Sequence, residues 1–68
     1  MISYKPLRDF MYFNNIKITD IIKLGINSRT AAKFSKDEHV SLETITKICL
    51  HYNIPIEAVV EVIPKSND

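Results

Sequence analysis

Residues 19–36 read TDIIKLGINSRTAAKFSK, a stretch that indicates a short helix, a tight turn and a second helix. Gly25 is the only glycine in the chain. Glycine is favoured where a helix ends in a positive-φ conformation, because it has no Cβ to clash with the backbone. We therefore expect one helix over about residues 18–24, the turn at Gly25, and the next helix over about residues 28–35.

The second of these helices has a buried side and an outward side. Ala31 and Phe34, three residues apart, supply the apolar side. Ile26 precedes the helix as a buried plug, and Asn27 or Ser28 offers a side-chain oxygen to the free N–H groups at its start. The side chains left facing outward are Asn27, Ser28, Arg29, Ala32, Lys33 and Lys36. Two helices joined by a glycine turn, the second displaying basic and amide groups, describe a helix-turn-helix with its recognition helix.

The charge is divided unevenly along the chain, whose formal net charge is +1. Residues 1–36 carry seven basic against two acidic side chains, a balance of +5. Residues 37–68 carry two basic against six acidic side chains, a balance of −4. The positive half contains the helix-turn-helix, as a surface facing DNA phosphates requires. A random distribution of surface charge is the alternative explanation of this observation alone.

The length of 68 residues predicts a single helix-turn-helix domain over residues 1–68. A chain of this size buries about 60% of the surface that its unfolded state exposes, so dimerisation would add stability. Cys49 is the only cysteine, which excludes an internal disulfide and favours a reduced, cytoplasmic location. No apolar run approaches the ~18–20 residues that span a bilayer, and no signal peptide is visible.

Before the motif, an apolar stripe predicts a helix over about residues 6–14. Its members are Leu7, Phe10 and Met11. Pro6 suits the first turn, where its missing N–H is not needed. Tyr12 and Phe13 fall partly outside the stripe, and we expect them to pack at the edge of the small core rather than to stack on bases.

After the motif, a second apolar stripe predicts a helix over about residues 42–52, with Ser41 as its N-cap and Glu43 in its first turn. Its members are Leu42, Ile45, Ile48, Cys49 and Tyr52. Pro55 then begins a fifth helix, whose end is β-branched and so is alternatively extended. We expect Ile2–Tyr4 to pair with residues 61–63 in a two-stranded sheet that joins the termini. Residues 65–68 are expected to fray.

Three segments resemble Xre-type transcriptional regulators related to lambda repressor and Cro. They read GINSRTAAKF (residues 25–34), VSLETITKIC (residues 40–49) and YNIPIEAVV (residues 52–60). The opening MISYKPL is similar to a compact single-domain subgroup from Gram-positive bacteria and their mobile elements. The resemblance covers nearly the whole chain. It implies an all-α, five-helix lambda-repressor-like domain that binds a palindromic operator as a homodimer and represses transcription.

The resemblance also implies roles for individual residues. Those expected to meet bases are Asn27, Ser28, Arg29, Ala32 and Lys33. Those expected to meet phosphates are Lys17, Thr19 and Lys36. In a major groove, Arg29 is suited to bind guanine through two hydrogen bonds, Asn27 to read adenine, and Ala32 to contact a thymine methyl. The expected partners are double-stranded DNA and a second copy of the chain, with no membrane and no small-molecule ligand.

The first helix of the motif departs from the family pattern. The family usually has an aliphatic residue five positions before the turn glycine and a small one four before it, where this chain has Asp20 and Ile21. That helix therefore looks one residue short, which puts its DNA contacts in doubt. The glutamine often found at its start is absent, and Ala31 is smaller than the usual core aliphatic.

We expect the dimer surface in the C-terminal half, from the fifth helix and the terminal strand.

Catalysis finds no support in the sequence, and we expect no enzyme activity, no cofactor and no metal site. His39 and His51 lack cysteine or carboxylate partners at metal-ligand spacing, and Cys49 lacks a base placed to activate it. The second function class is a protein-interaction module of the same fold, such as an antitoxin or an antirepressor partner, with weak or no specific DNA binding. The acidic half of the chain leaves that alternative open.

Overall fold

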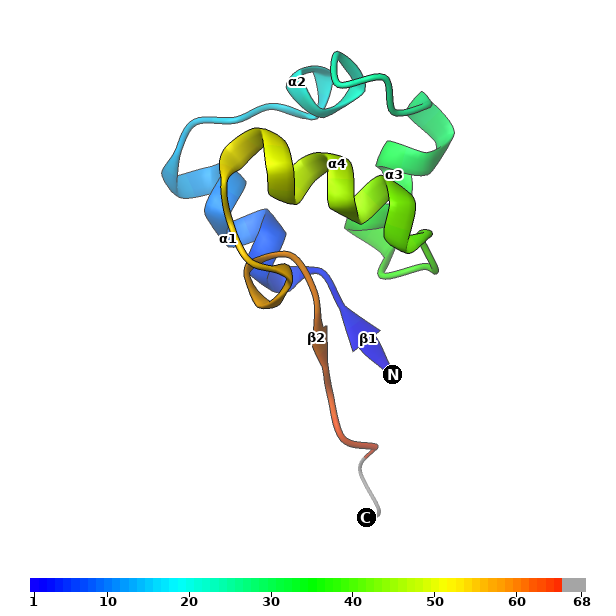
Figure 1. Cartoon of the computed structure of the whole chain (residues 1–68). Helices are drawn as coiled ribbons and strands as arrows, with labels where there is room; N and C mark the ends of the chain where they lie inside the picture. Colours follow the sequence, from blue (N-terminus) through cyan, green and yellow to red (C-terminus); the bar gives the residue numbers. More distant parts are fainter. Residues whose placement is uncertain (66–68) are drawn as a thin grey trace.

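The computed structural model describes residues 1–65, which form a helical domain closed by a small sheet (Figure 1). In chain order the elements are β1 (Ile2–Ser3), α1 (Lys5–Phe13), α2 (Ile18–Ile22), α3 (Ser28–Lys36), α4 (Leu42–Tyr52), the 3-10 helix η1 (Ile56–Ala58) and β2 (Glu61–Val62). The expected all-α fold with a terminal sheet is confirmed. Of the tail expected to fray, residues 66–68 lie outside the described residues.

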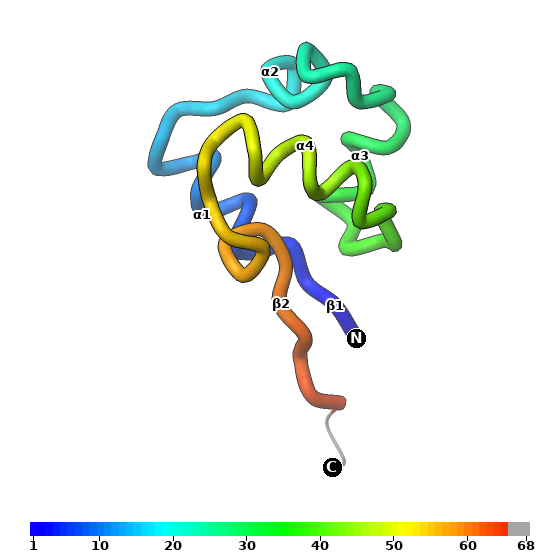
Figure 2. Tube along the Cα trace, viewed as in Figure 1, coloured from blue at the N-terminus to red at the C-terminus, as the bar shows by residue number. Residues whose placement is uncertain are grey.

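The two strands pair antiparallel, with Ile2 opposite Val62 and Ser3 opposite Glu61. The backbone N–H of Ile63 extends the pairing by donating to the carbonyl oxygen of Met1 at 2.8 Å. Figures 1 and 2 show the strands side by side at one end of the domain, with α2 at the opposite end. The sheet therefore joins the two ends of the described chain, as the sequence predicted.

The core lies between α1, α3 and α4 (Figure 1), and it includes Tyr4 from the segment before α1. Its fully buried side chains are Tyr4, Leu7, Ile21, Ala31, Ile48 and Val59. The rings of Tyr4 and Phe34 meet edge to face, with centroids 4.8 Å apart and planes at 80°. Such aromatic pairs add to the stabilisation that burial alone provides. The segment before α1 is thereby packed directly against α3.

Non-glycine residues with positive φ follow three of the helices. Asn15, Asp37 and Asn53 have φ of 54°, 55° and 54°. Asparagine and aspartate tolerate this left-handed conformation better than other side chains, because their short polar groups bond to the local backbone. Their use at the ends of α1, α3 and α4 explains how a chain with a single glycine ends four helices cleanly.

The short helix α2 begins with a side-chain cap and ends in a tight turn. The Oδ2 of Asp20 accepts a hydrogen bond from the backbone N–H of Lys17 at 2.8 Å, which satisfies one free donor at the helix start. At the other end the N–H of Leu24 donates to the carbonyl oxygen of Ile21 at 3.1 Å, so the α-helix stops at Ile22 rather than near residue 24. Asp20, which departs from the family pattern, is therefore the residue whose side chain caps the start of α2.

The expected fifth helix is only the three-residue η1. Ile56 in η1 is 47% exposed, whereas Val59 just after it is fully buried and accepts a hydrogen bond from the N–H of Leu7 at 3.3 Å. The β-branched residues that follow are extended in β2, which is the alternative that the sequence allowed. The C-terminal segment thus closes the core without building another α-helix.

Three apolar side chains expected in the core or at its edge lie outside it. Leu42 is 68% exposed, Tyr12 is 80% exposed and Phe13 is 79% exposed. Tyr12 and Phe13 follow the buried Leu7 by five and six positions, and the 3.6-residue period of a helix turns both away from the core. Leu42 is the first residue of α4 and projects beyond the core. The prediction that Tyr12 and Phe13 pack at the core edge was wrong.

Candidate nucleic-acid interface

The turn between α2 and α3 is built on Gly25, whose φ is +89°. This positive φ is the conformation that the sequence predicted. A Cβ added to Gly25 would meet no atom within 4 Å, so the backbone conformation and not a lack of space requires glycine here. Ile26 follows with 4% exposure and anchors the turn in the core. The turn thereby sets the start of α3 relative to α2.

The start of α3 is capped by Asn27. Its Oδ1 accepts a hydrogen bond from the backbone N–H of Arg29 at 2.7 Å, and its carbonyl oxygen accepts one from the N–H of Ala31 at 2.9 Å. The sequence had left Asn27 and Ser28 as alternatives for the cap, and Asn27 is the residue used. The side-chain oxygen of Asn27 is consequently turned back to the helix, while its Nδ2 is left for other partners.

The polar face of α3 lies opposite its buried face. Ala31 is fully buried and Phe34 is 2% exposed on the inner side. Four of the five residues expected to meet bases are exposed, and Lys33 is half-buried. The exposed residues are Asn27, Ser28, Arg29 and Ala32. A nine-residue helix with one buried and one free polar side has the shape that a DNA major groove admits.

The residues expected to meet phosphates flank this face on two helices. Lys17 is the N-cap residue of α2 and Thr19 lies in its first turn, while Lys36 is the last residue of α3. All three side chains are exposed. The side chain of Lys17 is left free by the cap, since Asp20 bonds only to the backbone N–H of Lys17.

Ion pairs divide the basic residues into two groups. Lys5 is paired with Asp9 at 2.8 Å and Arg8 with Asp37 at 2.8 Å, so these four charges largely cancel locally. Within residues 1–65, the basic side chains of the α2–α3 segment make no ion pair. They are Lys17, Lys23, Arg29, Lys33 and Lys36. The uncompensated positive charge of the N-terminal half is therefore concentrated on the helix-turn-helix, where anionic phosphates would be attracted.

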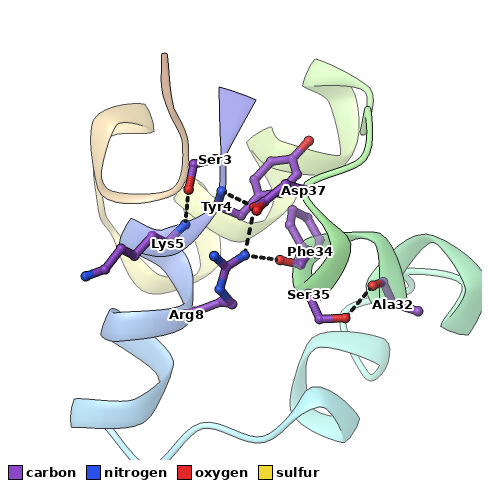
Figure 3. Close-up of polar contacts among 8 residues, drawn as sticks. All are labelled: Ser3, Tyr4, Lys5, Arg8, Ala32, Phe34, Ser35 and Asp37. Atoms are coloured by element: carbon purple, nitrogen blue, oxygen red, sulfur yellow. Dashed lines mark hydrogen bonds and ion pairs between the residues drawn. The ribbon is translucent and has the colours of Figure 1, made fainter. Parts of the chain in front are cut away.

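A cluster of polar contacts joins the C-terminal end of α3 to the start of α1 (Figure 3). Nη1 of Arg8 donates to the carbonyl oxygen of Phe34 at 2.7 Å and to Oδ1 of Asp37 at 2.8 Å. The same Oδ1 accepts the backbone N–H of Tyr4 at 2.8 Å. The guanidinium of Arg8, with the N–H of Tyr4, holds the pKa of Asp37 below its usual range. These contacts fix the far end of the recognition helix.

The sequence analysis missed this cluster. Arg8 and Asp37 are 29 positions apart, and no periodic pattern relates them. A weak signal was present in Asp37, because an aspartate just after a helix without a following glycine suits a left-handed cap. Its partner was not predictable, since it depends on how α1 packs on α3.

Residues 1–65 contain no group of three or more side chains placed to hold a metal ion. Burial raises the pKa of the Cys49 thiol, which makes it a weak nucleophile at neutral pH. None of the helices within residues 1–65 combines the length and the apolar character that crossing a bilayer requires.

Comparison with protein families gives one match. The model of the Cro/C1-type HTH DNA-binding domain matches residues 6–65, which is nearly the whole chain. Searches of curated proteins and of solved structures return no significant match. The match spans α1 to β2 and includes the turn at Gly25 together with all of α3.

Proposed function

This chain belongs to the family of Cro/C1-type HTH DNA-binding domains, which makes it a DNA-binding regulator, and we propose that it represses transcription as a homodimer on a palindromic operator. The observation that carries the proposal is the exposed face of α3, bordered by basic side chains that make no ion pair within residues 1–65. We further propose that residues 1–68 act as one domain, in the cytoplasm of a bacterium or in a phage-infected cell, without enzyme activity.

We assign base readout to the exposed face of α3. Arg29 binds guanine through its O6 and N7, because the planar guanidinium matches these two acceptors, and Lys33 makes a less rigid contact from its half-buried position. Ala32 contacts a thymine methyl, and Ser28 binds a base or a phosphate. Since Oδ1 of Asn27 is held by the N–H of Arg29, Asn27 reads a base through Nδ2 alone rather than through both of its amide atoms.

Phosphate contacts position the domain on the duplex. Lys17 and Thr19 at the start of α2 hold one stretch of the DNA backbone, and Lys36 at the end of α3 holds another. Three such contacts per copy are few, and only the two lysines, which neutralise phosphates, each contribute about −0.9 to the slope of log affinity against log salt concentration. A second copy on an adjacent half-site doubles the contacts and supplies the affinity of a specific operator complex.

The test is selection of the protein's targets from random duplex DNA at two salt concentrations, followed by sequencing. The expected result is an enriched palindrome whose half-sites lie about one helical turn apart. The matched variants are Arg29→Ala with Lys33→Ala, which should lose the motif, and Lys65→Ala, an exposed lysine outside α2 and α3, which should keep it. Circular dichroism checks that the folds are equal.

Salt-sensitive binding without an enriched motif would contradict this proposal. It would leave only phosphate attraction and favour the protein-interaction module, such as an antitoxin or an antirepressor partner. Retention of the motif by the double variant would show instead that α3 is not the reading helix.

A further inference from the structure

The outer face of α4 carries an apolar ridge that the fold leaves uncovered. Leu42, Thr46 and Leu50 follow one another at intervals of four residues, and the two leucines are 68% and 77% exposed. The hydroxyl of Thr46 donates to the carbonyl oxygen of Leu42 at 2.7 Å. Because its polar atom is satisfied within the helix, Thr46 offers its methyl group to the outside. The ridge is therefore apolar along its whole length.

The charged side chains beside the ridge are placed so that those of one copy can pair with those of a second copy. Glu43 and Lys47 are exposed, lie on the same side of the ridge, and make no ion pair within residues 1–65. Rows of side chains four apart are the ridges that interlock when two helices pack across each other. When two copies of α4 cross antiparallel at Thr46, each Glu43 faces the Lys47 of the second copy. A parallel arrangement would oppose like charges instead.

We propose that α4 is the surface through which two copies of this chain associate, with Leu42 of one copy against Leu50 of the other across a two-fold axis at Thr46. The proposal rests on the homodimer of the proposed function and names its interface. A two-fold contact needs a self-complementary patch, and the order Leu–Glu–Thr–Lys–Leu along this face supplies one.

The surface that the sequence analysis expected to form the dimer, η1 with β2, exposes less apolar area in a continuous patch than α4 does. The fifth helix is reduced to η1, which exposes Ile56, and β2 exposes Val62. These are single side chains on elements of three and two residues, with no repeated ridge. Two leucines and a threonine per copy are also fewer groups than the ~800 Å² per partner of a standard interface requires. The dimer is therefore expected to be weak in solution and to be completed on an operator.

The first experiment compares the oligomeric state of matched variants by analytical ultracentrifugation over a range of concentrations. Leu50→Glu places a charge in the ridge, and Val62→Glu places one on a side chain of nearly equal exposure, 79%, outside it. The wild type and Val62→Glu should move from monomer to dimer as concentration rises, and Leu50→Glu should raise the dissociation constant roughly tenfold or more. A wild type that stays monomeric, or a dimer lost only in Val62→Glu, would overturn the proposal.

The second experiment uses charge reversal. Glu43→Lys and Lys47→Glu should each weaken self-association, because each opposes like charges twice across the two-fold axis. An equimolar mixture of the two variants should associate again, since every facing pair is then of opposite sign. A role of these residues within one helix cannot produce that recovery, so its absence would refute the antiparallel contact.

DNA binding separates this inference from the proposed function. If the chain binds a palindrome but Leu50→Glu binds it with unchanged affinity, the α4 interface is wrong and the operator function stands. If the chain selects no DNA motif yet dimerises through α4, the interface stands and the operator function fails.

Discussion

The two ends of α3 are held in different ways. At its N-terminal end the helix depends on local features, namely the positive-φ turn at Gly25 and the Asn27 cap on the N–H of Arg29. At its C-terminal end it is tied to a distant part of the chain through Asp37, which binds Arg8 and the N–H of Tyr4. The N-terminal end is exposed to solvent, and the C-terminal end is bonded to the body of the domain.

This difference suggests how the domain combines rigidity with an accessible reading surface. Contacts of the C-terminal end are made by Asp37 and by the carbonyl oxygen of Phe34, and none uses a proposed base-reading side chain. Breaking them should therefore lower the stability of the fold without changing which DNA sequence is preferred. Changes at the N-terminal end should act on DNA binding as well, since the cap and the reading residues are neighbours there. The following substitutions test that division.

The largest effect is expected for Asp37→Ala. It removes the acceptor shared by Arg8 and the backbone N–H of Tyr4, and should lower the free energy of unfolding more than the substitutions that follow. Urea denaturation measures the change. The matched control is Asp9→Ala, which breaks the exposed Lys5–Asp9 pair at 2.8 Å and should cost much less, because solvent screens an exposed pair. Equal losses in the two variants would remove the distinction between the ends of α3.

The contact between Arg8 and Asp37 also predicts that the stability of the fold depends on pH. The pKa of Asp37 is lowered in the folded protein, chiefly by its hydrogen bond from Arg8, so the charged carboxylate favours the folded state above the usual aspartate pKa of about 3.9. This contribution is lost as the pH falls through the lowered value. The stability difference between the wild type and Asp37→Asn should therefore be constant near neutral pH and shrink below about pH 4. A constant difference down to pH 2 would contradict the assigned charge effect.

A smaller loss is expected for Gly25→Ala. The added methyl meets no atom within 4 Å, but the φ of +89° disfavours any side chain, and about 1–2 kcal/mol of stability should be lost. Thermal unfolding followed by circular dichroism gives the measurement. An alanine variant as stable as the wild type would mean that the turn does not hold this conformation in solution.

Two substitutions of Asn27, one of them conservative, test the role of the cap at the N-terminal end of α3. Asn27→Ala should cost about 1 kcal/mol of stability, and Asn27→Ser should recover most of it, because a hydroxyl also accepts the N–H of Arg29. On a selected operator, Asn27→Ser should lose the base contact assigned to Nδ2 while keeping the fold. Identical base preferences in the wild type and Asn27→Ser would assign Asn27 to the cap alone.

The smallest effect on stability, and of opposite sign, is expected for Tyr4, which packs against the C-terminal end of α3. Oη of Tyr4 is buried and has no hydrogen-bond partner within residues 1–65. Tyr4→Phe keeps the edge-to-face contact with Phe34 and removes an unsatisfied polar atom, so it should leave stability unchanged or raise it by up to about 1 kcal/mol. A loss beyond 1 kcal/mol would show that the hydroxyl is bonded.

The features that the sequence predicted are those encoded by neighbouring residues. The lone glycine located the turn, Ser41 was predicted as a cap and Asn27 as one of two candidates for another, and the β-branched ends indicated the sheet. The features it did not predict depend on distant packing. Arg8 could not be matched to Asp37 across 29 positions. Leu42 fits the apolar period of α4 yet lies beyond the core, because periodicity gives a direction around a helix and not the extent of its neighbours.

The central claim is that α3 reads bases, and the most direct test compares Arg29→Ala with Lys36→Ala on the selected operator and on single-base variants of it. Arg29→Ala should remove about 1–3 kcal/mol of preference for one guanine. Lys36→Ala should weaken binding to all sequences alike and reduce the salt slope by about one. If Arg29→Ala left every base preference intact, α3 would not be the reading helix.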